Sequence, residues 1–336
     1  MRRFDVAIAG ATGLVGREIV RALERRHFPV ASLHLLHADR AGGQHLFVNH
    51  HEVDVKDLSN RSFENIDVAL FAANAETSQH FVPAAVKSGA RVIDASPAFR
   101  LEPWVPLVVP DVNADDLDSH QGIVSSPSCV AAALVTALQP LHTVNRVRRA
   151  VVDTYQAVSA NGAAAMEELT GQTKLVLEGQ NVVPHFYPHQ IAFNVLPEID
   201  VFFDNGYSRE EWKLVQETRK LLHAEDMAIS ATCARVPVFV GDSEAVHVEL
   251  TEPMSVDQAR ALFAETPGLR LLDDPSVNLY PHPWAAAGHD EVLVGRIRQD
   301  ASHPRGLVMW VVADNLRKAA LNVVQILETM VARELI

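Results

Sequence analysis

The sequence predicts an α/β protein with a doubly wound parallel sheet in its first part and a mixed α+β region after it. Three observations lead to this prediction. The chain has 336 residues, which suits two domains of ordinary size. A short apolar strand near the start ends in a glycine-rich turn, and strands then alternate with helical patterns up to about residue 128.

The first part supplies the strands of the parallel sheet. Strands are predicted at residues 4–10, 33–36, 66–71, 91–94 and 105–109. A helical pattern follows the first strand from Val15, and another runs through residues 81–86 after the third strand. Strand–helix alternation of this kind is typical of a sheet with helices on both faces.

The pattern changes after residue 128. Helices are predicted at residues 129–141, 166–177, 209–223 and 316–334, and strands at 146–155, 227–232, 245–251 and 307–312. The last helix has its apolar residues spaced for packing onto another layer. This order predicts a mixed α+β domain.

Composition excludes several classes of protein. With 48% hydrophobic residues the chain can bury a sizeable core, and its net charge of −13 disfavours nucleic acid and anionic membrane surfaces as partners. No apolar stretch is long enough for a membrane span or an export segment, so a cytoplasmic location is expected. Two cysteines and 16 scattered histidines lack metal-ligand spacing, so no metal site is predicted.

The glycine turn after the first strand predicts a dinucleotide site. Gly10, Gly13 and Gly16 lie between a strand and a helix, where they permit a tight turn, close approach of a pyrophosphate and close helix packing. The alternative is a purely structural turn. The second strand ends in His37-Ala38-Asp39-Arg40, where Arg40 can receive a 2′-phosphate, so NADP is favoured over NAD.

Cys129 is the cysteine with a chemical setting. It follows Ser126-Pro127-Ser128 and opens a predicted helix, whose first-turn N–H groups and dipole favour a thiolate. A buried structural cysteine is the alternative. Cys233 lies in an alternating strand and is expected to serve packing.

Several motifs in register carry a resemblance to a known family. They include the glycine turn, Cys129 after x-Pro-x, Thr154-Tyr155-Gln156-Ala157-Val158-Ser159, Arg235-Val236-Pro237-Val238 and Asp314-Asn315-Leu316-Arg317-Lys318. On these motifs the chain resembles aspartate-semialdehyde dehydrogenase from end to end, and it also resembles the divergent Usg-type paralogues of that family.

The resemblance implies a fold, a reaction and a domain plan. The fold is a Rossmann-type dinucleotide-binding domain at residues 1–128 plus 313–336, with a catalytic and dimerisation domain at 129–312. The reaction is the NADPH-dependent reductive dephosphorylation of L-aspartyl-4-phosphate to L-aspartate-4-semialdehyde, a step of amino-acid biosynthesis. A small-molecule substrate and a homodimer are implied as partners.

The resemblance also implies a role for individual residues. Cys129 would form an acyl-thioester, and Gln156 would position the acyl group. Arg235 and Glu210 would hold the substrate's carboxylate and ammonium groups, while Arg100 and Lys213 would hold its phosphate. The residues implied for the cofactor are Gly10, Thr12, Gly13, Leu14, Val15, Arg40, Ser159 and Gln325.

Other positions depart from the family pattern. Asp242 stands where the family has its acid/base histidine, and an aspartate with a pKa near 4 is a poor acid at neutral pH. Ser128 replaces the asparagine before the cysteine, and Ala38 and Ala41 replace serines near the 2′-phosphate. These changes predict a divergent active site with impaired activity and weakened NADP binding.

Two hypotheses about function follow from the sequence. One is an oxidoreductase of the aspartate-semialdehyde dehydrogenase type. The other is a non-catalytic or weakly active paralogue that keeps the fold, cofactor binding or dimer assembly. His247 is not expected to replace the missing histidine, because an odd separation from Asp242 on one strand points the two side chains to opposite faces.

Overall fold

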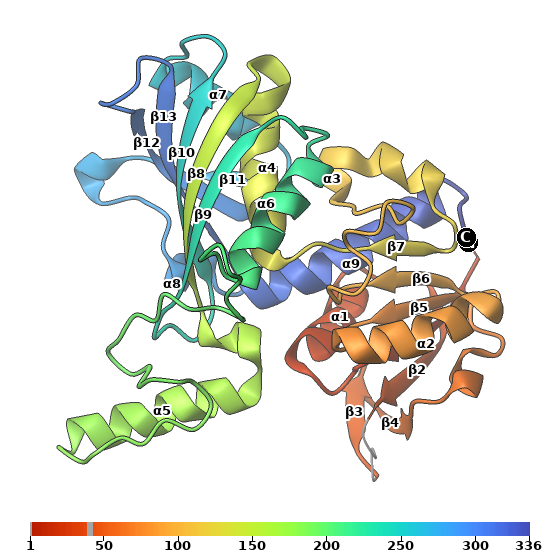
Figure 1. Ribbon diagram of the computed structural model, residues 1–336. Helices are drawn as coiled ribbons and strands as arrows, with labels where there is room; N and C mark the ends of the chain where they lie inside the picture. Colours follow the sequence, from red (N-terminus) through yellow and green to blue (C-terminus); the bar gives the residue numbers. More distant parts are fainter. Residues whose placement is uncertain (1, 39–42) are drawn as a thin grey trace. The chain divides into compact units, whose positions relative to one another are not determined.

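The computed structural model describes residues 2–38 and 43–336, which form two compact units (Figure 1). Unit 1 comprises Met1–Ser128 and Ala319–Ile336, and unit 2 comprises Cys129–Lys318. The chain leaves unit 1 at the residue before Cys129.

A seven-stranded sheet forms the centre of unit 1, in the order β3-β4-β2-β1-β5-β6-β7. The strands β1, β2, β4, β5, β6 and β7 pair in parallel, and β3 pairs with β4 in antiparallel fashion. The strand bounds are Phe4–Ala9 (β1), Val30–His37 (β2), His45–Val48 (β3), His51–Asp57 (β4), Val68–Phe71 (β5), Arg91–Asp94 (β6) and Ile123–Ser125 (β7).

Helices cover both faces of this sheet because its central strands, such as β1 and β5, are apolar on both sides. On one face Val6 and Ile8 of β1 pack with α1 (Leu14–Arg25) and with the part of α9 (Asn315–Ala332) that belongs to unit 1. On the other face Ala7 and Ala9 pack with α2 (Ala75–Lys87). This arrangement confirms the predicted doubly wound sheet.

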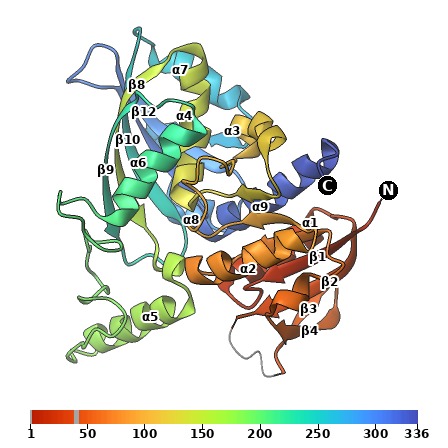
Figure 2. The ribbon, with the colours of Figure 1, turned by 45° about the vertical axis from the view of Figure 1, so that its right-hand side comes forward.

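Unit 2 is built on a six-stranded mixed sheet in the order β11-β12-β13-β10-β8-β9. The helices α4 (Cys129–Val144), α6 (Arg209–Leu221) and α7 (Val256–Glu265) pack on this sheet, and Figure 2 shows α4 and α6 along the same face. The strand bounds are Val147–Gln156 (β8), Ala228–Arg235 (β9), Asp242–Leu250 (β10), Leu269–Leu271 (β11), Val292–Gln299 (β12) and Gly306–Ala313 (β13). The mixed α+β prediction is confirmed.

The helix α5 (Ala163–Leu177) stands away from the sheet of unit 2, and residues 178–207 run back along it (Figure 1). A small apolar cluster that includes Leu169 and Ile191 joins the two segments. The buried side chain of Gln172 accepts the backbone N–H of Ile191 at 2.8 Å. This arm therefore has its own small core.

One predicted strand is wrong. Residues 105–109 form no strand, because Pro106 lacks a backbone N–H and Pro110 begins the short helix α3 (Pro110–Asn113). Only an isolated bridge joins Leu107 to Ser125, and β7 provides the edge of the sheet instead.

The β3–β4 hairpin, the strands β11 and β12 and the helix α7 were not predicted from the sequence. The hairpin turns at Asn49 and His50, which both have positive φ angles (48° and 66°) although neither is glycine. The expected glycine signal for such a turn was therefore missing.

The return to unit 1 comes at Ala319, six residues after the position 313 that the sequence suggested. Residues before Ala319 are tied to unit 2 by their side chains. Asp314 accepts the backbone N–H of Gly288 at 2.8 Å, and Asn315 accepts that of Gly241 at 2.9 Å. The first turn of α9 therefore belongs to unit 2.

We expect Gly16→Ala to lower the free energy of unfolding by about 1–3 kcal/mol, because a Cβ there would lie 2.2 Å from the carbonyl oxygen of Gly10. Gly171→Ala is the matched control in α5, where a Cβ would meet nothing within 4 Å, and it should be stabilising by about 0.5–1 kcal/mol. Urea unfolding measures both. Equal effects of the two substitutions would contradict this account of the α1 packing.

Candidate active site

Cys129 is the first residue of α4 and lies half-buried in unit 2. The helix behind it is apolar on nearly every side, from Val130 to Leu141, and packs against β8, β10 and β13. This packing fixes the position of the helix start and therefore the position of the Cys129 backbone, which carries the thiol.

Asp242 is the direct neighbour of the thiol. It is the first residue of β10 and is 4% exposed. The Sγ of Cys129 donates to Oδ2 of Asp242 at 3.2 Å, and the backbone N–H of Ala157 donates to Oδ1 at 2.8 Å. The carboxylate that the sequence placed at the family's histidine position therefore contacts the predicted nucleophile.

The environment disfavours a thiolate. Burial raises the pKa of the Cys129 thiol well above its usual value, and the charge of Asp242 raises it further. The backbone N–H of Val130 acts in the opposite direction but is the weaker influence. The helix start, which favours a thiolate, is therefore opposed by desolvation and by a neighbouring anion.

Asp242 is not the ordinary aspartate that the sequence suggested. Burial raises its pKa to about 6, although the Ala157 N–H, the charge of Arg235 and the Cys129 thiol all lower it. A carboxyl group with this pKa can both accept and return a proton near neutral pH.

A second buried carboxyl group, Glu244, lies two residues further along the same face of β10. It is 1% exposed, and its Oε2 has no hydrogen-bond partner within the described part of the chain. Burial and then the charge of Asp242 raise its pKa well above the usual range. Burial and the nearby carboxylate of Asp242 therefore both disfavour the charged form of Glu244.

The predicted substrate residues of unit 2 gather around this pair. Arg235 ends β9, is 3% exposed and donates Nη1 to the carbonyl oxygen of Ala157 at 2.7 Å. Buried Gln156 donates to Oε1 of Glu210 at 3.3 Å, and Lys213 pairs with Oε2 of Glu210 at 2.6 Å. The capping box of Ser208 starts α6 just before Glu210 and so fixes the position of that carboxylate.

Arg100, the other predicted phosphate ligand, lies in unit 1. It is 7% exposed, with Nε donating to the carbonyl oxygen of Ser126 at 2.9 Å and Nη2 to that of Ala95 at 2.6 Å. Asn322 of α9 donates to the Ser126 hydroxyl at 2.8 Å. Arg100 therefore braces the segment that leads to Cys129, and its role toward phosphate stays a prediction.

The glycine turn fits a dinucleotide. Gly10 has φ +85°, and a Cβ there would lie 2.4 Å from the carbonyl oxygen of Ala72, which follows β5. Gly13 caps α1 without a side-chain hydrogen bond, so the first turn at Leu14 and Val15 presents backbone N–H groups. The turn lies where the strand order switches from β2 to β5 on either side of β1, the usual ligand position of such sheets.

The remaining cofactor predictions lie in different places. Ser159 of unit 2 accepts Nδ2 of Asn315 at 2.9 Å. The Oε1 of Gln325 in α9 is buried and has no hydrogen-bond partner among residues 2–38 and 43–336. This oxygen can therefore accept a hydrogen bond from the N–H of an amide group in a ligand. Arg40 lies outside the described residues.

His247 lies on the other face of β10, as predicted. Its Nδ1 is 3.6 Å from Oδ2 of Asp300, whereas Asp242 faces Cys129. This histidine therefore cannot replace the missing acid/base group. Cys233 is fully buried in β9, where it serves packing.

The sequence did not predict a role in the site for Ala157 or Glu244. Ala157 contributes only backbone groups, for which no residue signal exists. Glu244 had a signal, since residues 242, 244 and 246 alternate onto the buried face of β10, but a carboxylate at such a position is unusual.

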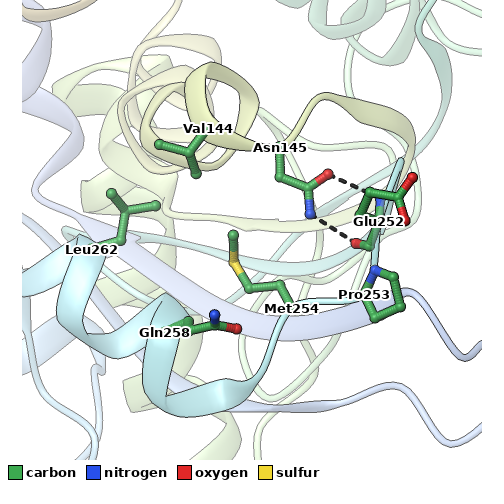
Figure 3. Close-up of a pocket in the computed structure, with 7 residues that line it drawn as sticks. All are labelled: Val144, Asn145, Glu252, Pro253, Met254, Gln258 and Leu262. Carbon is green, nitrogen blue, oxygen red and sulfur yellow. Dashed lines mark hydrogen bonds between the residues drawn. The ribbon is translucent and has the colours of Figure 1, made fainter.

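A groove in unit 2 lies at the other end of α4 (Figure 3). Its lining includes Val144, Met254 and Leu262, and α4 separates it from Cys129 by about 22 Å. The polar groups of Asn145 bond the backbone of Glu252, as the dashed lines show. This groove contains no group for the chemistry of Cys129.

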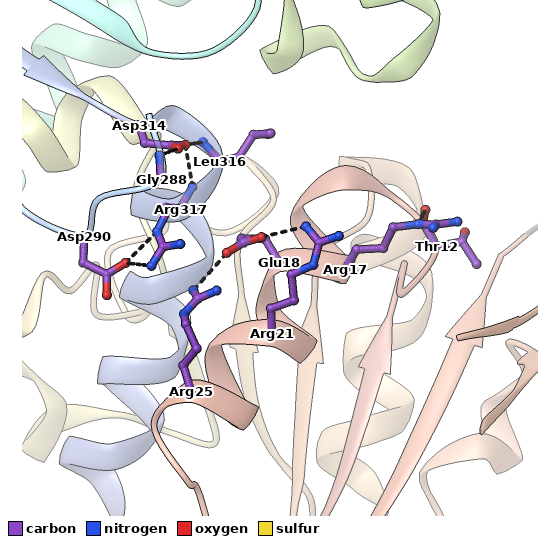
Figure 4. A network of polar contacts seen from close by, with 10 residues as sticks. All are labelled: Thr12, Arg17, Glu18, Arg21, Arg25, Gly288, Asp290, Asp314, Leu316 and Arg317. Atoms are coloured by element: carbon purple, nitrogen blue, oxygen red, sulfur yellow. Dashed lines mark hydrogen bonds and ion pairs between the residues drawn. The ribbon is translucent and has the colours of Figure 1, made fainter. Parts of the chain in front are cut away.

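Charged side chains also stabilise the start of α9 and the helix α1 (Figure 4). In unit 2, Asp314 accepts the backbone N–H groups of Leu316 and Arg317 at 3.0 Å, and Arg317 pairs with Asp290 at 2.6 Å. In unit 1, the nearly buried Glu18 of α1 pairs with two arginines of the same helix. Both sets have structural roles.

With this geometry established, comparison with known proteins defines the class. The profile described as "Semialdehyde dehydrogenase, NAD binding domain" matches residues 5–120, and that described as "Semialdehyde dehydrogenase, dimerisation domain" matches residues 138–318. The two matches together place the chain in the class of semialdehyde dehydrogenases.

Individual relatives show which family of semialdehyde dehydrogenases the chain belongs to. The aspartate-semialdehyde dehydrogenase of Aquifex aeolicus is 48% identical over 99% of both chains. The crystal structure of aspartate semialdehyde dehydrogenase II from Vibrio cholerae is 40% identical, has a TM-score of 0.96 and covers 98% of this chain and 99% of its own. The chain therefore belongs to the aspartate-semialdehyde dehydrogenase family. No helix in the described ranges is long and apolar enough to cross a membrane.

We expect Asp242→Asn to gain stability relative to the wild type as the pH rises from 4 to 8. The raised pKa of Asp242 means that the folded state binds an extra proton between about pH 4 and 6, and the stability from that proton is lost as the pH rises through this window. The neutral asparagine avoids the loss, which is roughly 2–3 kcal/mol at 1.36 kcal/mol per pKa unit.

Urea unfolding at several pH values measures this effect. Asp300→Asn is the control with the opposite sign, because the Ser302 hydrogen bonds lower the pKa of Asp300. A stability difference between Asp242→Asn and the wild type that stays constant with pH would contradict the assigned electrostatics.

Proposed function

We propose that this protein catalyses the NADPH-dependent reductive dephosphorylation of L-aspartyl-4-phosphate to L-aspartate-4-semialdehyde, at a rate far below that of an ordinary enzyme. The observation that supports the proposal is the contact of the Cys129 thiol with Asp242 inside a cluster that holds Arg235, Glu210 and Lys213. The thiol would provide the nucleophile, and the contact with Asp242 would lower its reactivity.

The acylation step uses the two contacting side chains. The Cys129 sulfur attacks the acyl carbon of the acyl phosphate while its proton passes to Asp242, the C–O bond to phosphate breaks, and a thioester and free phosphate result. NADPH, when bound, would supply the hydride that reduces the thioester to the aldehyde. Asp242 then returns the proton to the released sulfur.

The charges around the thiol suit the substrate. The guanidinium of Arg235 can pair with a substrate carboxylate, and Glu210 can accept its ammonium group. Gln156, hydrogen-bonded to Glu210, would orient the acyl group. Lys213 and Arg100 would hold the phosphate.

Asp242 limits the rate in this scheme. A histidine in its place would gain a positive charge when it took the thiol proton, and that charge would stabilise the thiolate. Asp242 becomes neutral instead, and while ionised it repels the thiolate. Loss of well-matched acid–base catalysis costs about 10²–10⁴-fold.

The alternative function is that of a non-catalytic paralogue which keeps the fold, cofactor binding or dimer assembly. The raised thiol pKa favours this alternative, because a thiol that stays protonated at neutral pH is a poor nucleophile. The retained cluster of Arg235, Glu210 and Lys213 around the thiol favours the catalytic proposal.

A homodimer formed through unit 2 is part of the proposal. The match to a dimerisation domain supports it. The sheet face opposite α4 and α6 carries Tyr155 and Trp310, whose rings lie 5.4 Å apart, and the α5 arm exposes Phe186 and Phe193. Exposed aromatic side chains of this kind suit an interface between subunits.

We expect Asp242→His to raise turnover at least tenfold. An imidazole can take the thiol proton and leave a stabilised thiolate, which Asp242 cannot provide. The assay is phosphate-dependent reduction of NADP⁺ with L-aspartate semialdehyde, on wild type and variant. Cys129→Ser, alone and combined with Asp242→His, is the control that should remove activity in both.

Two results would count against the proposal. Wild-type turnover in the ordinary range of about 1–10³ s⁻¹ would contradict the limiting role of Asp242. Absence of turnover in both proteins, at any pH from 6 to 9, would favour the non-catalytic alternative.

A further inference from the structure

A cavity of about 620 Å³ lies in unit 2 over the strands β12 and β13, toward the β11 edge of the sheet. The loop from Tyr280 to Pro283 lines it together with Arg296 and Arg298 of β12 and Trp310 of β13. Its volume falls in the range of about 300–1,000 Å³ that is usual for small-molecule sites. None of these residues has a role in the proposed reaction.

Two arginines give the cavity a positive charge, and no carboxylate lines it among the described residues. The guanidinium of Arg296 has no hydrogen-bond or ion-pair partner within residues 2–38 and 43–336. Arg298 donates Nη1 to the carbonyl oxygen of Arg296 at 2.8 Å. Burial and the charge of Arg296 lower the pKa of Arg298, although Asp300 and Asp273 raise it. Two like charges at one cavity favour an anionic ligand.

The other side chains of the cavity suit an aromatic ring. Tyr280 is 40% exposed and Trp310 is partly exposed, so both rings have free surface for stacking. The imidazole of His282 lies edge-on to Tyr280, with ring centroids 6.4 Å apart. Its Nδ1 accepts the backbone N–H of Ala285 at 3.2 Å, so the neutral ring carries its proton on Nε2. This N–H can donate to an anion.

The backbone holds the loop and the arginines at one cavity. Arg296 has a φ of +55°, an uncommon value for a residue other than glycine, and lies in a β-bulge between Gly295 and Arg298. Bulges change the direction of side chains and are frequent next to functional sites. A Cβ on Gly295 would lie 2.6 Å from Cδ of Pro281, so the loop lies directly on the strand.

The loop also contacts the region of the predicted catalytic pair. Its last residue, Pro283, begins the short helix α8 (Pro283–Ala286). A Cβ on Gly241, the residue before Asp242, would lie 2.9 Å from Cα of Pro283. The cavity is therefore bounded by a segment that is packed at both ends, which preserves its shape before a ligand binds.

We propose that this cavity is a binding site for a small aromatic compound that carries an anionic group. Arg296 and Arg298 hold the anion, and Nε2 of His282 donates to it. The rings of Tyr280 and Trp310 contact the aromatic part. The site is separate from Cys129 and goes beyond the proposed reaction.

Calorimetric titration of the full-length protein with phenyl phosphate tests this inference. We expect a Kd of about 0.1–1 mM, which is ordinary for a ligand of this size. Benzyl alcohol has the ring without the charge and should bind at least about tenfold more weakly. Arg296→Gln should weaken phenyl phosphate about tenfold, and Tyr280→Leu about threefold to tenfold, because each removes one half of the recognition.

Two variants serve as controls. Arg270→Gln removes an exposed arginine of the neighbouring strand β11 that does not line the cavity, so the affinity should stay unchanged. Lys213→Ala removes a predicted phosphate ligand of the active site and should also leave the affinity for phenyl phosphate unchanged. Thermal unfolding of each variant verifies that the fold is retained.

Three results would overturn the inference. The wild type could show no saturable binding of phenyl phosphate. Binding that is lost in Lys213→Ala and retained in Arg296→Gln would assign the ligand to the active site. Trp310 also lies on the sheet face proposed for the homodimer, so sedimentation of Arg296→Gln is the third measurement. A variant that dissociates, with no ligand binding in the wild type, would show that the cavity receives a second copy of the chain.

Discussion

The hydrogen bond between the Cys129 thiol and the Asp242 carboxylate is the interaction on which the chemistry of this protein depends. It joins the start of α4 to the start of β10, and both elements are fixed by extensive apolar packing. The packing therefore holds the two backbones in place beside each other. Because the base in this contact is an anion, its own negative charge opposes the thiolate that it would have to generate.

The surrounding charges compensate one another around this contact. Arg235 lowers the pKa of Asp242 and Glu210 raises it, while burial and the charge of Asp242 raise the pKa of Glu244. Lys213 neutralises Glu210 at 2.6 Å. The site therefore retains the cations and the anion that suit an aspartyl substrate, while the proton-transfer group has changed.

Much of the fold was predictable because its signals are local. The apolar strands around Gly10 and the alanine-rich helix from Cys129 gave the doubly wound sheet and the start of the second unit. The strand predicted at residues 105–109 was wrong because prolines lie on both sides of its apolar residues. The β3–β4 hairpin was not predicted because its turn contains Asn49 and His50 and no glycine. In the site, residue identities predicted the cluster. They could not predict the pKa of about 6 for Asp242, because the burial of a side chain depends on the tertiary structure.

The pH dependence of Cys129 alkylation tests the central claim most directly. Iodoacetamide reacts with the thiolate, so the labelling rate follows ionisation of the thiol, and peptide mass analysis separates Cys129 from the buried Cys233. The account predicts slow labelling at pH 7 and a rate that still rises about tenfold per pH unit through pH 9, because the pKa of the thiol is raised by burial and by Asp242. Fast labelling that reaches a plateau below pH 7 would show an activated thiolate and would contradict the account.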